Sequence, residues 1–405
     1  MPRTHDPRTH IESLRNHLAS PDASISFLFG AGTSSSVNLA SPQAGKKSEY
    51  KPLIPSVAAL TELCRAEICK KGDAFSKAWD SAKAELIGTT PQPNIEDILS
   101  AVRRKLDAAG LGDKLLGLDI SQLREFESSI RSTIAVAVSP KEDSIPSPLP
   151  HDGFSLWLKS ATRRKPIELF TTNYDILFEA SFERLRIPSF DGFVGTLHPF
   201  FRADFVERDD LLPGSSVVRL WKVHGSVYWD TLKDSFGSRI VRRDTPTGGA
   251  LILPSHLKYD ESRRQPYLAY LDRLRSQLDK DDSILISCGF SYSDQHINAV
   301  IFDVLENRPR AHVVALVFGS LEPDSPVVKA ARRLRNLLVL ARNGAIVGGQ
   351  EGSWQLIEPI DASTATFMDP AFDSNAAPSS IDEAQRGEFR LGDFVWLARF
   401  LETMQ

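Results

Sequence analysis

The sequence is poor in cysteine and lacks long apolar runs. Its three cysteines, Cys64, Cys69 and Cys288, are too few and too scattered for a disulfide framework, and their scarcity suits a reducing compartment. No run approaches the roughly 20 apolar residues of a membrane-spanning helix. The first ten residues are polar and carry charges of both signs, unlike a secretory signal. We therefore expect a cytoplasmic protein without membrane segments.

An excess of charge of one sign is also missing. The 405 residues include 48 lysines and arginines against 52 aspartates and glutamates, which gives a net charge of -4. No global basic field exists to attract nucleic acid or an anionic membrane, and we expect direct binding to neither. Hydrophobic residues at 41% and charged residues at 25% are typical of a soluble globular protein. The length suits one large domain with a smaller one.

Strand-like runs are missing between residues 56 and 138. Apolar residues recur there at helical spacing, as in Ile95, Ile98, Leu99 and Val102. Four prolines between residues 139 and 150 then interrupt the pattern. We interpret residues 50–155 as a helical insert domain.

Outside the insert, short runs rich in β-branched residues alternate with helical patterns. These runs are residues 25–29, 167–171, 217–223, 251–253, 284–288, 313–318 and 337–340. The alternation predicts an α/β fold, a Rossmann-like doubly wound parallel sheet covered by helices on both faces. Residues 1–49 and 156–345 would form this sheet domain. Residues 346–405 have a weaker pattern, which predicts a C-terminal linker and docking segment.

The first strand-like run ends in Gly30, Ala31, Gly32, Thr33 and Ser34. Glycines at a turn between a strand and a helix allow backbone amides to approach a pyrophosphate, and the two hydroxyls add donors. The third glycine of the dinucleotide-binding fingerprint is missing. A turn that needs glycine only for its geometry would have the same sequence.

Three further strand ends carry polar groups. They are Thr172, Asn173 and Asp175 after the second run, His224 after the third, and Gly289, Ser291 and Asp294 after residue 288. Each group has a structural alternative, because Asn173 and Asp175 could cap a helix or satisfy a loop, and a single histidine is more often structural than catalytic. Ligands bind at the carboxyl ends of strands in open α/β sheets. Four such ends together predict one ligand site.

These segments, in this order, resemble a known family. Gly-Ala-Gly-Thr-Ser, Thr-Thr-Asn-Tyr-Asp, Lys-Val-His-Gly-Ser and Gly-Phe-Ser-Tyr-Ser-Asp are similar to motifs of the sirtuins, and specifically of the bacterial sirtuin-like NAD hydrolases of anti-phage defence systems. The resemblance covers roughly residues 10 to 320. It implies a Rossmann-type NAD-binding domain in which Asn173 and His224 are catalytic. The residues that would bind NAD are Gly30, Ala31, Gly32, Thr33, Ser34, Thr172, Asp175, Gly289, Ser291 and Asp294.

One departure from the family bears on the reaction. Deacetylating sirtuins carry two cysteine pairs for a structural zinc after the His-Gly motif, whereas residues 226–287 contain no cysteine. A four-cysteine site is therefore impossible there, and we expect no zinc-ribbon module and no metal. This absence favours water over an acyl-lysine as the acceptor. It predicts an NADase, an NAD+ glycohydrolase that takes NAD as its substrate and forms nicotinamide and ADP-ribose.

Two other functions stay open. One is a sirtuin-type protein deacylase or ADP-ribosyltransferase, and the other is a non-catalytic module that binds NAD or ADP-ribose. The resemblance further implies an NAD-depleting effector of abortive infection. Such a protein would form a homo-oligomer and work with a separate HerA-type hexameric ATPase, or alternatively with an Argonaute-like partner.

Overall fold

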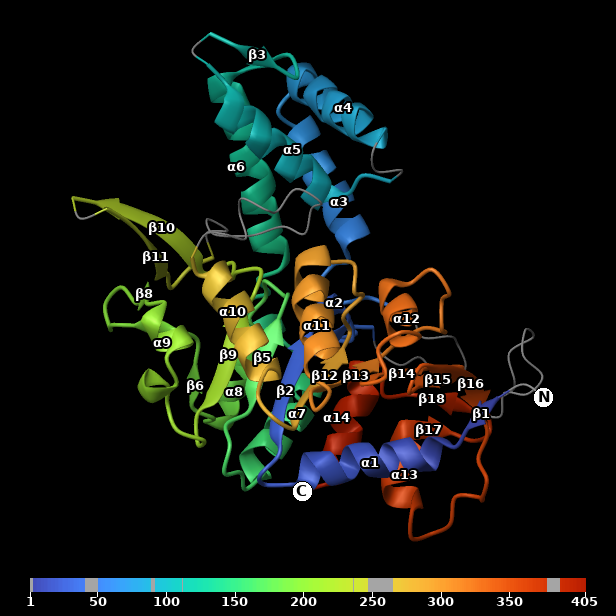
Figure 1. The fold of residues 1–405 in the computed structure, drawn as a ribbon. Helices are drawn as coiled ribbons and strands as arrows, with labels where there is room; N and C mark the ends of the chain where they lie inside the picture. Colours follow the sequence, from blue (N-terminus) through green and yellow to red (C-terminus); the bar gives the residue numbers. More distant parts are fainter. Residues whose placement is uncertain are drawn as a thin grey trace.

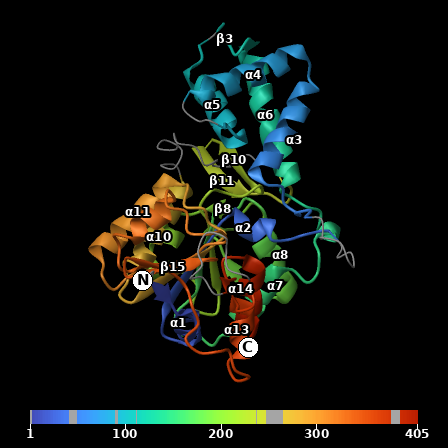
Figure 2. The same cartoon turned by 90° about the vertical axis from the view of Figure 1, so that its right-hand side faces the viewer.

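The structure is a computed structural model that describes residues 3–40, 50–88, 92–110, 112–235, 237–246, 265–376 and 387–405. A domain built on a large sheet carries a bundle of helices at one end (Figures 1 and 2). The predicted strand at 251–253 lies outside the described residues. In the described part of the chain, no helix is long and apolar enough to cross a membrane.

The central sheet has ten strands in the order β1-β16-β15-β14-β13-β12-β2-β5-β9-β6. Their bounds are Thr4–His5 (β1), Ser24–Phe29 (β2), Glu168–Thr171 (β5), Ser189–Phe190 (β6), Val218–Lys222 (β9), Ser283–Cys288 (β12), His312–Leu316 (β13), Leu337–Ala341 (β14), Gly344–Val347 (β15) and Gln350–Trp354 (β16). All neighbours from β14 to β6 are parallel. The predicted parallel α/β sheet is confirmed.

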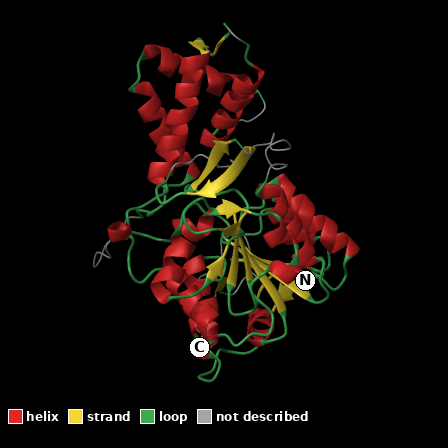
Figure 3. Ribbon diagram, turned by 90° about the vertical axis from the view of Figure 1, so that its left-hand side faces the viewer, coloured by secondary structure: helices red, strands yellow, loops and turns green. Residues whose placement is uncertain are grey.

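Helices cover both faces of this sheet (Figure 3). One face carries α1 (Pro7–Ala19), α7 (Pro150–Ser160), α8 (Leu177–Leu185), α13 (Ala365–Ala371) and α14 (Phe394–Glu402), and the other carries α10 (Tyr267–Leu278), α11 (Gln295–Asn307) and α12 (Pro326–Ala331). Strand β2 supplies both cores, because side chains alternate along a strand: Phe27 and Phe29 face the first set of helices, and Leu28 faces the second. A strand buried on both faces reads as an uninterrupted apolar run.

Residues 346–354 belong to the central sheet, not to a linker as predicted. Strands β14, β15 and β16 are antiparallel neighbours, and β16 also pairs with β1. Trp354 at the end of β16 is fully buried, and its indole nitrogen donates to the carbonyl of Ala341 over 2.8 Å. Helix α14 packs in the core of the sheet domain, where Phe394, Leu397 and Phe400 are buried. The predicted domain limits themselves stay a prediction.

The insert consists of α3 (Val57–Cys69), α4 (Asp73–Ile87), α5 (Ile95–Ala108) and α6 (Ile120–Ala137). These helices surround a separate core that includes Trp79 and Phe126. Two short antiparallel strands also occur in this region, β3 (Lys114–Leu115) and β4 (Leu118–Asp119). The expectation that it contains no strand was therefore wrong. A short helix, η1 (Glu142–Ser144), follows. Helix α7, which the predicted insert included in part, packs in the core of the sheet domain instead.

Two smaller sheets complete the fold. An antiparallel sheet contains β7 (Phe193–Val194), β8 (Phe200–Phe201), β10 (Trp229–Asp234) and β11 (Gly237–Arg242). The short helices α9 (Asp204–Glu207) and η2 (Asp209–Leu211) follow β8 along the chain, and β17 (Phe372–Asp373) pairs with β18 (Glu388–Phe389). The β10–β11 hairpin follows the His224 loop directly. Within the described ranges, no group of three or more histidine, cysteine, aspartate or glutamate side chains could hold a metal ion.

Candidate active site

Strand β2 lies where the direction of the strand order changes. From β2 the order runs through β5 and β9 on one side and through β12 and β13 on the other. In open α/β sheets the crevice at such a switch point is where ligands bind. The four predicted motifs follow β2, β5, β9 and β12, so the topology brings them to one edge. A cavity of about 580 Å³ lies there, which is within the usual range for small-molecule sites.

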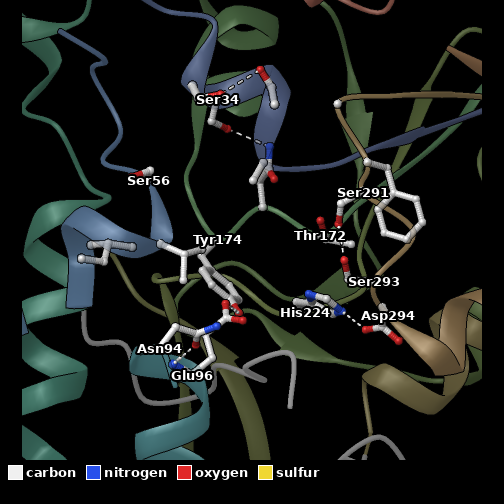
Figure 4. A pocket seen from close by; sticks show the side chains of 18 of the residues that line it. Ser34, Ser56, Asn94, Glu96, Thr172, Tyr174, His224, Ser291, Ser293 and Asp294 are labelled. Carbon is white, nitrogen blue, oxygen red and sulfur yellow. Dashed lines mark hydrogen bonds and ion pairs between the residues drawn. The ribbon is translucent and has the colours of Figure 1, made fainter. Parts of the chain in front are cut away.

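Most of the predicted site residues line this cavity. They are Ala31, Gly32, Ser34, Thr172, Asn173, Asp175, His224, Gly289, Ser291 and Asp294. Gly30 and Thr33 do not line it. The insert supplies a second wall with Asn94, Glu96 and Asp97. Figure 4 shows Asn94 and Glu96 on the side of the cavity away from Ser291 and Asp294. Nothing in the local sequence indicates that these three residues face the motifs.

Three glycines hold the first and last motifs in close contact. A Cβ on Gly30 would lie 2.5 Å from the carbonyl oxygen of Gly289, and one on Gly32 would lie 2.6 Å from the Cα of Gly289. Gly289 itself has a φ of +65°, which favours glycine. The amides of Gly30 and Gly32 donate to the carbonyls of Cys288 and Gly289 over 3.2 and 3.0 Å. A pyrophosphate bound by these two amides, as predicted, would therefore compete with the carbonyls of Cys288 and Gly289 for the same hydrogens.

This contact gives a steric prediction. Gly32→Ala would force the backbone of α2 (Ala31–Ser35) away from the loop after β12, because the added Cβ meets backbone atoms that cannot rotate aside. We expect a loss of about 1–3 kcal/mol in the free energy of unfolding, measured by urea titration. Gly214→Ala is the matched control, since a Cβ there meets nothing within 4 Å. Equal stabilities of the two variants would contradict the close contact.

The Asn173 side chain is held by the glycine-containing turn. Its Nδ2 donates to Thr33 Oγ1 over 2.9 Å and to Ser34 Oγ over 2.7 Å. Both amide hydrogens are thus used inside the protein, and the carbonyl oxygen is the atom available to accept from a ligand. Thr33 Oγ1 in turn donates to the carbonyl of Gly30 over 2.9 Å. Thr33 therefore acts behind the site, as a support for Asn173.

Ser34 and Asp175 continue this chain of hydrogen bonds. Ser34 Oγ donates to Asp175 Oδ2 over 2.5 Å, so its hydrogen is not directed at a phosphate as predicted. Asp175 Oδ1 accepts from the amide of Leu177 over 3.1 Å at the start of α8. Burial raises the pKa of Asp175, although the charge of Lys222 and the bond from Ser34 oppose this. Asp175 thus ties the Asn173 loop to the turn after β2.

Lys222 fixes the end of β9 against the same loop. Its side chain is almost fully buried, and Nζ donates to the backbone carbonyl of Asp175 and, over 2.7 Å, to Glu179 Oε1. A buried ammonium requires such partners. The residue two positions on, His224, is thereby placed next to the Asn173 loop.

His224 is oriented by Asp294. His224 Nε2 lies 2.9 Å from Asp294 Oδ2, and both side chains are buried. Asp294 also caps α11, because its Oδ1 accepts from the amides of His296 and Ile297. A carboxylate only accepts, so we assign the ring hydrogen to Nε2, which makes Nδ1 the nitrogen that can take up a proton. The pair has the arrangement of a general base and its orienting group.

Comparison with known proteins agrees with the motifs. Residues 167–337 match the family model of the SIR2-like domain, a region that runs from β5 to the start of β14 and contains Asn173, His224 and Asp294. No curated protein matches the sequence.

Among solved structures, a Sir2 homologue in complex with NAD has 14% identity and a TM-score of 0.31, over 81% of this chain and 87% of that one. A mutant Sir2 homologue in complex with ADP-ribose has 13% identity and a TM-score of 0.29, over 78% and 87%. What the sequence predicted and the comparison supports is that residues 167–337 are similar to the SIR2-like domain family.

Proposed function

We propose that this protein hydrolyses NAD+ to nicotinamide and ADP-ribose. The observation that carries the proposal is that Asn173 and His224 line one cavity at the switch point of the sheet, with His224 held by the buried Asp294. The similarity of residues 167–337 to the SIR2-like domain supports an NAD-dependent activity. The missing cysteines between residues 226 and 287 favour water as the acceptor.

The groups of the site suit this reaction. The bond between C1′ of the ribose and the pyridinium nitrogen breaks, its electron pair stays on the nitrogen, and neutral nicotinamide leaves. No general acid is needed, because the leaving group already carries a positive charge. His224 Nδ1 would take a proton from water as the water oxygen bonds to C1′. The Asn173 carbonyl oxygen would accept from that water or from a ribose hydroxyl.

Incubation of the purified protein with NAD+ tests this proposal. We expect nicotinamide and ADP-ribose in equal amounts with no acceptor added besides water, and a rate lower by on the order of 10²–10³-fold for Asn173→Ala, which removes a preorganised polar group. Nicotinamide release that requires an acyl-lysine peptide would indicate a deacylase instead. Absence of release, both alone and with the product of the neighbouring gene, would overturn the proposal.

The biological role that we propose rests on the resemblance of the motifs. The protein would deplete NAD as the effector of an anti-phage system, as a homo-oligomer that works with a HerA-type hexameric ATPase. Copurification with the neighbouring gene product, followed by light scattering, tests the assembly. A monomer that copurifies with no partner would contradict it.

A further inference from the structure

Tyr174 lies between two residues of the site and contacts a third. It follows Asn173 and precedes Asp175, and its ring lines the cavity. Its ring centroid lies 6.4 Å from that of His224. The backbone carbonyl of Tyr174 accepts from the amide of Val227, just beyond His224, over 3.2 Å. The orientation of Tyr174 is therefore linked to both proposed catalytic residues.

The tyrosine hydroxyl reaches across to the insert. Tyr174 Oη donates to Glu96 Oε1 over 3.4 Å, and Glu96 lies in the first turn of α5 (Figure 4). Glu96 is only 9% exposed although it lines the cavity. Burial raises the pKa of Tyr174 well above its ordinary value, so the phenol keeps the hydrogen that it donates.

The insert holds Glu96 in a defined place. The side chain of Asn94 accepts from the amides of Glu96 and Asp97, and Asp97 in turn accepts from the amide of Asn94. This capping box fixes the first turn of α5. The core of the insert also includes Val227, in the loop that follows His224, and Leu177, the first residue of α8, which directly follows the Asn173 loop. The insert thus packs directly on the two loops of the site.

We propose that Glu96 is a positioning residue of the active site, through which the insert holds Tyr174 and, with it, the Asn173 loop against His224. The inference rests on the proposed function for its kinetic readout. It predicts that the insert is required for turnover as well as for the shape of the cavity. Glu96 acts through Tyr174, so the effects of removing either partner should not add.

A double-mutant cycle tests this role. We expect Glu96→Ala and Tyr174→Phe each to lower kcat for NAD+ cleavage about tenfold, the size of one hydrogen bond, with KM within about twofold. The double variant should be no slower than the slower single variant. Glu96→Gln should recover most of kcat, because its amide oxygen can still accept from the phenol. Glu85→Ala is the control: it removes a carboxylate that pairs with Lys105 of α5 at 2.8 Å but does not line the cavity.

Losses that multiply in the double variant would overturn the inference, as would an equal loss in Glu85→Ala. Hydrogen exchange of residues 172–178 gives a readout that does not need turnover. Glu96→Ala and Tyr174→Phe should speed exchange there, and Glu85→Ala should not. Unchanged exchange in both variants would overturn the positioning role even if NAD+ is cleaved. Failure of the wild type to cleave NAD+, with exchange altered as expected, would overturn only the proposed function.

Discussion

Replacing His224 with alanine is expected to lower kcat for NAD+ cleavage by on the order of 10²–10⁴-fold, the range that a positioned general base contributes. The fold should survive, because Asp294 keeps its two backbone donors at the start of α11 when the imidazole is removed. The measurement is single-turnover release of nicotinamide, with circular dichroism to confirm folding. A folded variant that turns over at the wild-type rate would exclude His224 as the base.

The variant Asp294→Asn tests the orientation of the His224 ring while the imidazole itself is kept. Asparagine also caps helices, so α11 should keep its first turn. An amide nitrogen facing His224 Nε2 would donate to the ring, and the ring hydrogen would then move to Nδ1, where the base is needed as an acceptor. We therefore expect most of the loss seen in His224→Ala, with binding of ADP-ribose retained in calorimetry. An active Asp294→Asn variant would contradict the assigned tautomer.

Replacing Glu168 with glutamine should cause the largest loss of stability, about 3–5 kcal/mol in the free energy of unfolding. Glu168 on β5 is fully buried, and it accepts from Arg219 Nη1 over 2.9 Å and from Arg273 Nε over 2.8 Å. Trp221 Nε1 also donates to it, over 2.8 Å. The variant would leave the buried guanidinium of Arg219 without its carboxylate partner, and it would leave Arg273 with only the more exposed Asp209, whose Oδ1 lies 2.7 Å from Arg273 Nη1. Urea unfolding at neutral pH measures the effect.

The stability that Glu168 contributes should depend on pH. Burial alone would raise its pKa, but the hydrogen bond and charge of Arg273 and the charge of Arg219 lower it below the ordinary value. A carboxyl whose pKa is lowered on folding stabilises the folded state above its ordinary pKa of about 4.3, and this contribution is lost as the pH falls through the lowered value. The gap in stability between wild type and Glu168→Gln should therefore narrow in acid.

An exposed ion pair provides the control for this network. Arg164 and Asp22 lie 3.0 Å apart with side chains that are 77% and 60% exposed. Asp22→Asn should cost less than about 1 kcal/mol, because solvent and salt screen exposed pairs. If Glu168→Gln were no more costly than Asp22→Asn, the buried network would contribute little to stability.

How far the fold can be predicted depends on the kind of strand. The buried parallel strands β2, β5, β9, β12, β13 and β14 were predictable because a strand covered on both faces is apolar throughout. The hairpin of β15 and β16 was not predictable, because Gly344 and the run Gln350–Trp354 have the composition of a loop. Only the tertiary structure shows that Trp354 packs in the core. The β10–β11 hairpin is partly exposed and polar, and it gave no comparable signal.

Short sequence motifs are enough to predict where the candidate site lies. Short polar motifs that directly follow buried strands must meet at one edge of a parallel sheet. For this reason the sequence alone predicts that Asn173, His224 and Asp294 share one site, although they are far apart along the chain. What each group does there depends on partners far away in sequence. The Ser34 hydroxyl donates a hydrogen bond to Asp175, the Gly32 amide donates to the Gly289 carbonyl, and Glu96 of the insert accepts from the Tyr174 hydroxyl. Such pairings have no local pattern, because the packing of separate segments creates them.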